Sequence, residues 1–183
     1  SLTVLTVTKK GQIKKTTVAE YKRPLRKGKL GLTIREDDEI LTAAITSGSN
    51  DILLVTKKGL SIRFNETDVR TMGRLATGVK GINLADDDEV VGAAVISSDD
   101  SVLTVTENGY GKRTAVEEYR VQTRGGKGVL AIKTSERNGN VVGVLTVHDD
   151  YQVMLIADSG KIIRMPMDTL RLIGRNTQGV RLI

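Results

Sequence analysis

The sequence has no cysteine and no tryptophan, and its 183 residues include only one histidine, one phenylalanine and two prolines. The missing cysteine excludes disulfides, thiolate zinc sites and cysteine nucleophiles, and it favours a cytoplasmic setting. A single histidine, His148, leaves little room for a catalytic triad or a histidine metal cluster. The chain also lacks a signal-peptide pattern after Ser1 and any apolar run near the roughly 20 residues that cross a membrane. These absences argue against most enzymes and against secreted or membrane-spanning proteins.

The residues that are present indicate a folded chain with a moderate positive charge. Hydrophobic residues make up 39% and charged residues 27%, so neither a collagen-like nor a disordered composition fits. The length is enough for one or two globular domains. The formal net charge of +6 favours acidic partners, but the positions of the charges must decide which partner.

Two series of glycines divide the chain into repeats of about fifty residues, a spacing typical of repeat architectures. The first series follows apolar strand patterns and consists of Gly11, Gly59, Gly109 and Gly160. The second series consists of Gly28, Gly78, Gly128 and Gly179. Acidic runs recur in the same register at 36–39, 86–89 and, more loosely, 136–139. We predict a single repeat domain with repeats at about 1–50, 51–100, 101–150 and 151–183, the last incomplete and the whole cut from a longer array.

The pattern inside each repeat is that of β-strands. Leu60, Ile62 and Phe64 alternate with polar residues, and Asn108-Gly109 is a strong hairpin signal because both residues tolerate positive φ. The acidic runs are expected to be solvated turns. Each repeat predicts about four short antiparallel strands, which cannot bury their apolar faces alone, so neighbouring sheets must stack. The expected fold is all-β and propeller-like.

Lysine and arginine keep the register of the glycines. A basic residue stands four positions after each glycine of the first series and four before three glycines of the second, with Arg26 and Lys27 near that place in the first repeat. Such a row suits the phosphates of a nucleic acid. The five aromatic rings are too few for a surface that stacks the bases of a single strand, so we predict a duplex ligand. The predicted DNA-binding residues are Lys14, Lys15, Arg26, Lys27, Arg63, Arg74, Lys80, Lys112, Arg113, Arg124, Lys127, Arg164, Arg175 and Arg181.

Two segments carry a resemblance to a known family. The run from Glu107 to Tyr119 and the run from Ile173 to Val180 closely resemble the C-terminal domain of the gyrase A protein of DNA gyrase, and the resemblance covers essentially the whole chain. That family has a Gln-Arg-Arg-Gly-Gly-Lys-Gly box in its first blade, and Gln122–Gly128 matches six of its seven positions, Thr123 being the departure. Because this segment lies in the third repeat, we expect it to be a degenerate counterpart, with the family's own box before Ser1.

The resemblance implies a β-pinwheel, here about four blades of a five- or six-bladed disc, whose basic rim binds and wraps duplex DNA without sequence preference. In the whole enzyme, this wrapping supports ATP-dependent negative supercoiling together with the remaining parts of gyrase A and with gyrase B, in the bacterial cytoplasm and nucleoid. The cleavage tyrosine and ATP site belong to other parts of that enzyme, so no catalytic residue, metal or cofactor is expected here. Arg124 and Lys127 would supply charge in the box, whose structural alternative is a tight turn between blades.

Three other functions stay open from the residues. Within the resembled family, the nearest alternative is the equivalent domain of topoisomerase IV, which usually has degenerate boxes and introduces no supercoils. A bladed scaffold that binds an acidic protein would also carry rows of basic residues. A hydrolase is the weakest alternative, because His148-Asp149-Asp150 lacks the further ligands that a catalytic metal needs. Tyr21 and Tyr119 share a repeat position, which favours packing over nucleophilic chemistry.

Overall fold

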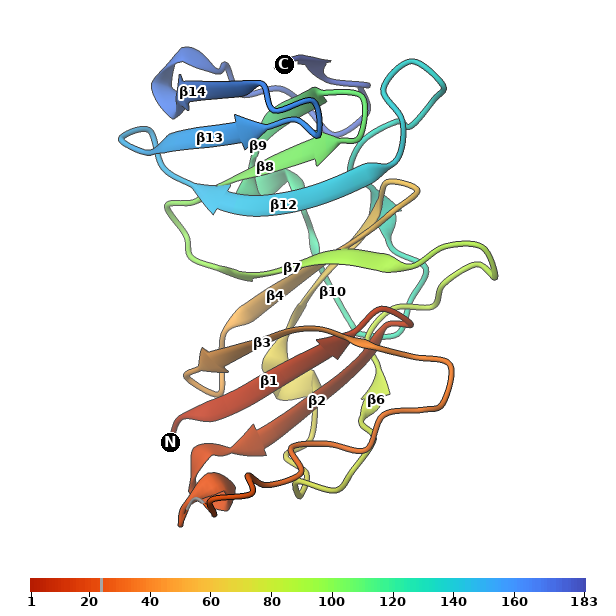
Figure 1. Cartoon of the computed structure of the whole chain (residues 1–183), viewed down its shortest axis with the longest axis vertical. Helices are drawn as coiled ribbons and strands as arrows, with labels where there is room; N and C mark the ends of the chain where they lie inside the picture. The colour runs from red at the N-terminus through yellow and green to blue at the C-terminus, as the bar shows by residue number, and fades with distance from the viewer. Residues whose placement is uncertain (24) are drawn as a thin grey trace.

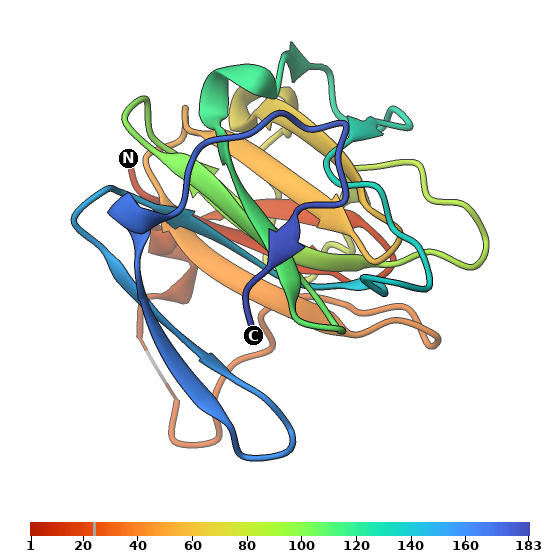
Figure 2. The ribbon, with the colours of Figure 1, turned by 90° about the horizontal axis from the view of Figure 1, so that it is seen from above.

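The chain forms four β-sheets that follow one another along the long axis of the molecule (Figure 1). The structure, a computed structural model, describes residues 1–23 and 25–183. The first repeat lies at one end and the last at the other, where the final hairpin extends to one side (Figure 2). Over the described ranges, no helix is long and apolar enough to cross a membrane. The predicted all-β, bladed architecture is confirmed.

Each of the first three repeats supplies three long strands to its own sheet. In chain order these are β1 (Thr3–Thr8), β2 (Gln12–Thr17) and β3 (Ile40–Thr46); β4 (Asp51–Thr56), β5 (Leu60–Asn65) and β7 (Val90–Ile96); and β8 (Ser101–Thr106), β9 (Tyr110–Ala115) and β12 (Val141–Val147). The fourth repeat supplies the hairpin β13 (Gln152–Ile156) and β14 (Ile162–Pro166). A short 3-10 helix follows the second strand of every repeat: η1 (Val18–Tyr21), η2 (Glu66–Asp68), η3 (Val116–Glu118) and η4 (Met167–Thr169).

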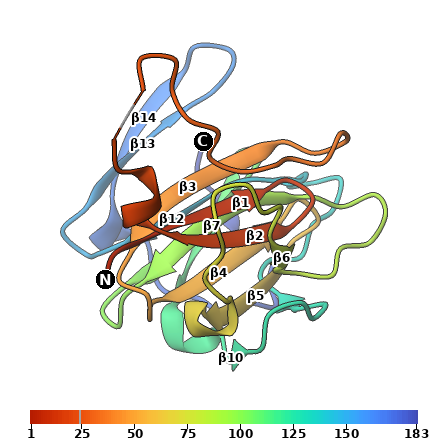
Figure 3. The same cartoon turned by 90° about the horizontal axis from the view of Figure 1, so that it is seen from below.

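The outer strand of each complete sheet comes from the following repeat. The sequence had predicted about four strands within each repeat and no exchange between repeats. The exchanged strands are β6 (Val79–Lys80), β10 (Val121–Gln122), β11 (Val129–Leu130) and β15 (Val180–Arg181). β6 pairs with β2, β11 with β5 and β15 with β9, all antiparallel, and Figure 3 shows β6 beside β2. β10 pairs with β5 in parallel, so the sheets are not purely antiparallel. Within the described residues the last sheet has two strands.

The glycines of the second series make this exchange possible. Gly78, Gly128 and Gly179 stand directly before β6, β11 and β15, with φ of 106°, 81° and 78°, which side chains disfavour. A Cβ atom on Gly128 would lie 2.2 Å from the carbonyl oxygen of Ser61 in β5. The second glycine series therefore marks where the chain crosses from its own repeat onto the sheet of the preceding repeat.

The hydrophobic core lies between successive sheets rather than inside single repeats. Three buried clusters join repeats one and two, two and three, and three and four, represented by Leu5 with Phe64, Leu53 with Tyr119, and Leu103 with Met167. Tyr119 is buried in the second cluster, as expected for a packing residue, and its burial raises the pKa of its hydroxyl. The predicted stacking of neighbouring sheets is confirmed by this placement of the core.

The acidic runs are more than solvated turns, because one member of each has a structural bond. The side chain of Asp38 accepts a hydrogen bond from the backbone N–H of Lys10 at 2.9 Å, and Asp88 accepts one from Lys58 at 3.0 Å. Asn138 holds the corresponding place in the third repeat and is fully buried. Asp38 and Asp88 thus tie the loops before β3 and β7 to backbone in their own repeats. Asn138 donates from Nδ2 to the carbonyl oxygens of Lys133 at 2.8 Å and of Gln178, in the fourth repeat, at 3.1 Å.

We expect Asp88→Ala to lower the free energy of unfolding by about 1–2 kcal/mol, because the backbone amides of Lys58 and Glu89 lose a shared, largely buried acceptor. Asp86→Ala, at an exposed position of the same loop, is the matched control and should cost less than about 0.5 kcal/mol. Urea unfolding of the two variants measures both values. Equal losses would contradict the structural role of Asp88.

Candidate nucleic-acid interface

The basic residues that follow the hairpin glycines bridge consecutive repeats instead of facing solvent. Arg113 donates from Nη1 to the carbonyl oxygen of Met167 in η4 at 3.0 Å, and Arg63 donates in the same way to Val116 and Tyr119 at 3.1 Å. Lys15 reaches the carbonyl oxygen of Glu66 in η2 at 2.9 Å. The basic residues that recur at this position in the sequence therefore form hydrogen bonds between consecutive repeats.

The fourth member of this series, Arg164, differs from the other three in its exposure. Arg164 lies on β14 and is exposed, whereas Arg113 and Lys15 are buried and Arg63 is largely buried. Arg113 also pairs with Asp149 at 2.6 Å and Arg63 with Asp51 at 2.8 Å.

Two further lysines of the predicted set are buried. Lys14 donates to the carbonyl oxygens of Gly31, at 2.6 Å, and of Arg74. Lys112 donates to the carbonyl oxygens of Gly174, at 3.0 Å, and of Arg175. Burial lowers the pKa of Lys14, and it lowers the pKa of Lys112 to about 8.

These contacts show where the structure places five members of the predicted DNA-binding set. Five of its side chains are enclosed within the protein and already use their donors on neighbouring repeats: Lys14, Lys15, Arg63, Lys112 and Arg113. A charge that is buried needs partners inside the protein, and here those partners are mainly carbonyl oxygens. These five side chains are therefore largely withdrawn from solvent.

The arginines four positions before the second glycine also bridge repeats. Arg124 donates to the carbonyl oxygens of Asp68 and Lys80, both at 3.0 Å. Arg175 donates to those of Glu118 at 2.7 Å and Leu130 at 2.6 Å, and Arg74 donates to Leu30 at 2.7 Å. Each of these arginines ties its own crossing loop to the preceding repeat.

The glycine-rich box, Gln122–Gly128, is a turn between repeats. The N–H of Gly125 donates to the carbonyl oxygen of Gly81 at 2.7 Å, and the carbonyl of Gly126 accepts from Asn83 at 2.8 Å. The Gly125 amide is thus already bonded within the protein, which supports the structural alternative for that part of the box. Lys127 is exposed and still fits the predicted contact with phosphate.

The basic side chains that remain exposed lie mainly on or beside the crossing loops and exchanged strands. The exposed members of the predicted set are Arg26, Lys27, Lys80, Lys127, Arg164 and Arg181. Lys80 ends β6, Lys127 precedes β11 and Arg181 ends β15, so successive sheets carry a cation at the same outer edge. We call this edge, formed by residues 70–80, 120–130 and 171–181, the outer rim.

Sequence reasoning missed one exposed series on the outer rim. Arg70, Arg120 and Arg171 are all exposed and stand two residues after η2, η3 and η4. Their spacing of 50 and 51 residues equals that of the second glycine series. The signal was present in the sequence, but these arginines stand eight residues before Gly78, Gly128 and Gly179, and the prediction took only residues within four positions of a glycine of either series. Lys133, also exposed, was missed because threonine and asparagine hold its place in the first two repeats.

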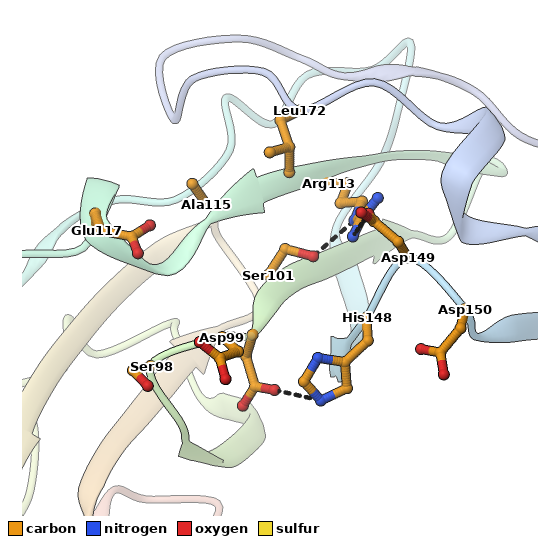
Figure 4. A pocket seen from close by; sticks show the side chains of 11 residues that line it. Ser98, Asp99, Ser101, Arg113, Ala115, Glu117, His148, Asp149, Asp150 and Leu172 are labelled. Atoms are coloured by element: carbon orange, nitrogen blue, oxygen red, sulfur yellow. Dashed lines mark hydrogen bonds and ion pairs between the residues drawn. The ribbon is translucent and has the colours of Figure 1, made fainter.

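An acidic pocket of about 590 Å³ lies between the turns that precede β8 and β13 (Figure 4). His148 Nε2 is 3.0 Å from Asp100 Oδ1, while Asp149 pairs with Arg113. Among the residues that the structure describes, no three histidine, aspartate or glutamate side chains are placed to hold a metal ion. The His148-Asp149-Asp150 segment therefore contributes a close contact to Asp100 and an ion pair to Arg113.

Comparison with known proteins gives one consistent result. A family model described as the DNA gyrase C-terminal domain, beta-propeller, matches residues 3–47, 50–97, 100–148 and 151–183. The gyrase A protein of Klebsiella oxytoca is 45% identical over 180 residues, covering 98% of this chain and 20% of that protein. The corresponding protein of Clostridium acetobutylicum is 49% identical over 176 residues, covering 96% and 21%. The chain thus spans about a fifth of the length of these relatives.

Two solved structures agree over the full chain. The C-terminal domain of a DNA topoisomerase IV superposes with a TM-score of 0.93 at 28% identity, and this chain covers 57% of it. A DNA gyrase A C-terminal domain superposes with a TM-score of 0.88 at 26% identity, with 62% of it covered. Fold and sequence therefore point to the same kind of domain.

Proposed function

Because this chain belongs to the family of DNA gyrase C-terminal β-propeller domains, we propose that it binds duplex DNA along the outer rim, without sequence preference, and bends the duplex around successive sheets. The observation that carries the proposal is the recurrence of exposed cations at one structural position per repeat. Arg70, Arg120 and Arg171 form one such row, and Lys80, Lys127 and Arg181 lie along the same edge. A regular row of cations matches the regular spacing of phosphates.

Charge sorting supports the outer rim as the contact surface. Lysines at the hairpin turns are compensated by the acidic runs, since Lys9 lies 2.8 Å from Glu39 and Lys58 pairs with Asp87. For Lys80, Lys127 and Arg181, no ion pair occurs among the residues described by the structure. Uncompensated cations release more counterions from DNA, and that release supplies most of the affinity for a non-specific site.

For the whole protein we infer the gyrase A component of a bacterial type II topoisomerase that acts in the cytoplasm and nucleoid. The named relatives are gyrase A proteins, which favours gyrase and implies gyrase B as a partner. In that enzyme this domain would present wrapped DNA for negative supercoiling, with the cleavage tyrosine and the ATP site elsewhere. Topoisomerase IV is the second candidate, because its C-terminal domain gives the TM-score of 0.93.

A topological experiment separates these two functions. A nicked plasmid is ligated in the presence of the 183-residue chain, and the linking number is read after the protein is removed. A handed change in linking number that grows with protein concentration supports DNA wrapping of the gyrase kind. Binding without any change in linking number favours the topoisomerase IV alternative.

The binding proposal itself predicts a strong salt dependence. We expect the logarithm of the association constant for a duplex of about 40 base pairs to fall with the logarithm of salt concentration with a slope of about −3 or steeper, because each neutralised phosphate contributes about −0.9. Fluorescence anisotropy between about 50 and 300 mM KCl measures this slope, and duplexes of unrelated sequence should give the same value. No binding at low salt would overturn the proposal and favour a scaffold for an acidic protein.

A further inference from the structure

The buried lysine of the third repeat, Lys112, lies beneath a crossing loop of the outer rim. Its ammonium donates to the carbonyl oxygens of Gly174 at 3.0 Å and Thr177 at 3.3 Å, to the Thr177 hydroxyl at 3.3 Å, and to the Arg175 carbonyl. The side chain is fully buried. Among the described residues, no carboxylate forms an ion pair with it. Several carbonyl oxygens thus turn inward toward a single positive charge.

Further cations lie on this loop and next to it. The backbone N–H of Lys133 donates to the Thr177 carbonyl at 2.9 Å, and Arg175 extends from the loop to the carbonyls of Glu118 and Leu130. Arg181 follows two residues after Gly179. The Lys112 ammonium and the Lys133 backbone therefore bond to the same loop.

The other repeats show that this register position carries a lysine in the first repeat but not in the second. Lys14 makes the equivalent contact in the first repeat, to the Arg74 carbonyl. The register position in the second repeat is Ile62, which is buried and lies 3.7 Å from the place that a Cβ on Gly126 of the glycine-rich box would take. An apolar side chain therefore holds this register position beside the glycine-rich box.

We propose that Lys112 is a positioning residue for DNA binding: its buried ammonium holds loop 174–177 so that Lys133 and Arg181 face the duplex. This inference rests on the proposed function. Since side chains alternate along a strand, Lys112 lies on the opposite face of β9 from Arg113, which is bonded to Met167 and Asp149. Lys112 itself does not reach the surface, so it acts through the loop.

The electrostatics of the site add a consequence that can be measured. Burial, followed by the positive charges of Arg175 and Lys133, lowers the pKa of Lys112 to about 8. Phosphates bound on the outer side would offset those two charges and raise this pKa, so DNA binding is accompanied by proton uptake. Affinity should then fall as pH rises from about 7 toward 9.5. Below about pH 7 Lys112 is protonated with or without DNA and contributes no pH dependence.

The experiment compares the 183-residue chain with Lys112→Met and Lys112→Arg, using anisotropy with a duplex of about 40 base pairs from about pH 7 to 9.5. We expect the unmodified chain to lose up to about 10-fold in affinity over this range. Lys112→Met should bind about 5-fold more weakly at about pH 7, with a flat profile. Lys112→Arg, whose charge persists at every pH used, should recover affinity at neutral pH and also stay flat. Ile62→Met is the matched control in the second repeat and should keep the original profile.

A measurement on the unmodified chain keeps the inference testable if Lys112→Met does not fold. The pKa of Lys112, followed by NMR through its Cε resonance, should rise when saturating duplex is added. Identical pH profiles for the unmodified chain and the Lys112 variants, or a Lys112 pKa that DNA leaves unchanged, would overturn the inference. Absence of binding by the unmodified chain would instead overturn the proposed function, so the two failures are distinguishable.

Discussion

We expect Arg113→Ala to lower the free energy of unfolding by about 3 kcal/mol, since the substitution removes a buried guanidinium with three hydrogen-bond partners. Nε donates to Ser101 at 2.6 Å, Nη1 to the Met167 carbonyl at 3.0 Å and Nη2 to Asp149 at 2.6 Å. Asp149 is 83% exposed, so the ion pair itself contributes little and most of the loss comes from Ser101, Met167 and the packing of the arginine stem.

The matched control for this prediction is Arg164→Ala. Arg164 holds the same register position in the fourth repeat, but it is exposed on β14. We expect its replacement to cost less than about 0.5 kcal/mol. Guanidinium or urea unfolding of both variants measures the difference. Similar losses at the two positions would show that the bond between repeats does not stabilise the fold.

The second large effect concerns the outer rim. We expect simultaneous replacement of Lys80, Lys127 and Arg181 by glutamine to weaken duplex binding about 100-fold at about 0.1 M salt and to make the log–log salt slope less steep by about 2.7, because three phosphate contacts are lost. Anisotropy titrations at several salt concentrations measure both quantities. The unfolding midpoint should hardly change, because all three side chains are exposed.

The control removes the same amount of charge from another part of the surface. Lys9, Lys10 and Lys58 lie near Glu39, Asp37 and Asp87, with the first two pairs at 2.8 and 3.6 Å. Their replacement by glutamine changes the net charge equally but removes charges that are already compensated. We expect less than about 5-fold loss of affinity and nearly the original slope. Equal effects of the two triple variants would show that DNA senses only net charge and that the outer rim is not the contact surface.

Much of the fold could be predicted because glycines at turns and alternating apolar residues in strands have local conformational preferences. The two glycine series mark backbone positions with positive φ, for example 86° at Gly11 and 78° at Gly179, and few other residues accept such angles. Alternation such as that of Leu60, Ile62 and Phe64 predicted β5, and all three lie in that strand. The exchange of strands could not be predicted, since the pairing of β6 with β2 joins residues that are distant in the sequence, such as Gln12 and Lys80.

The candidate site was predictable only in part, because periodic basic residues can have two different structural roles. Repeated lysines and arginines can form a row on a surface or a row of bonds between repeats, and both patterns have the same period. Arg63 and Arg113 belong to the second kind and Lys127 to the first. Burial separates the two, and burial depends on which neighbouring carbonyl oxygens the fold brings near.

The amino-acid order alone established an all-β array of repeats, its turn positions and a periodic positive charge, because strand alternation, glycine torsion and residue spacing are local properties. Tertiary structure decided which charges remain for a ligand. It enclosed Lys14, Lys15, Lys112 and Arg113 between repeats and left Lys80, Lys127 and Arg181 exposed at the edge. A buried cation must be satisfied by the carbonyl oxygens around it, whereas an exposed and uncompensated cation can exchange its water and counterions for phosphate.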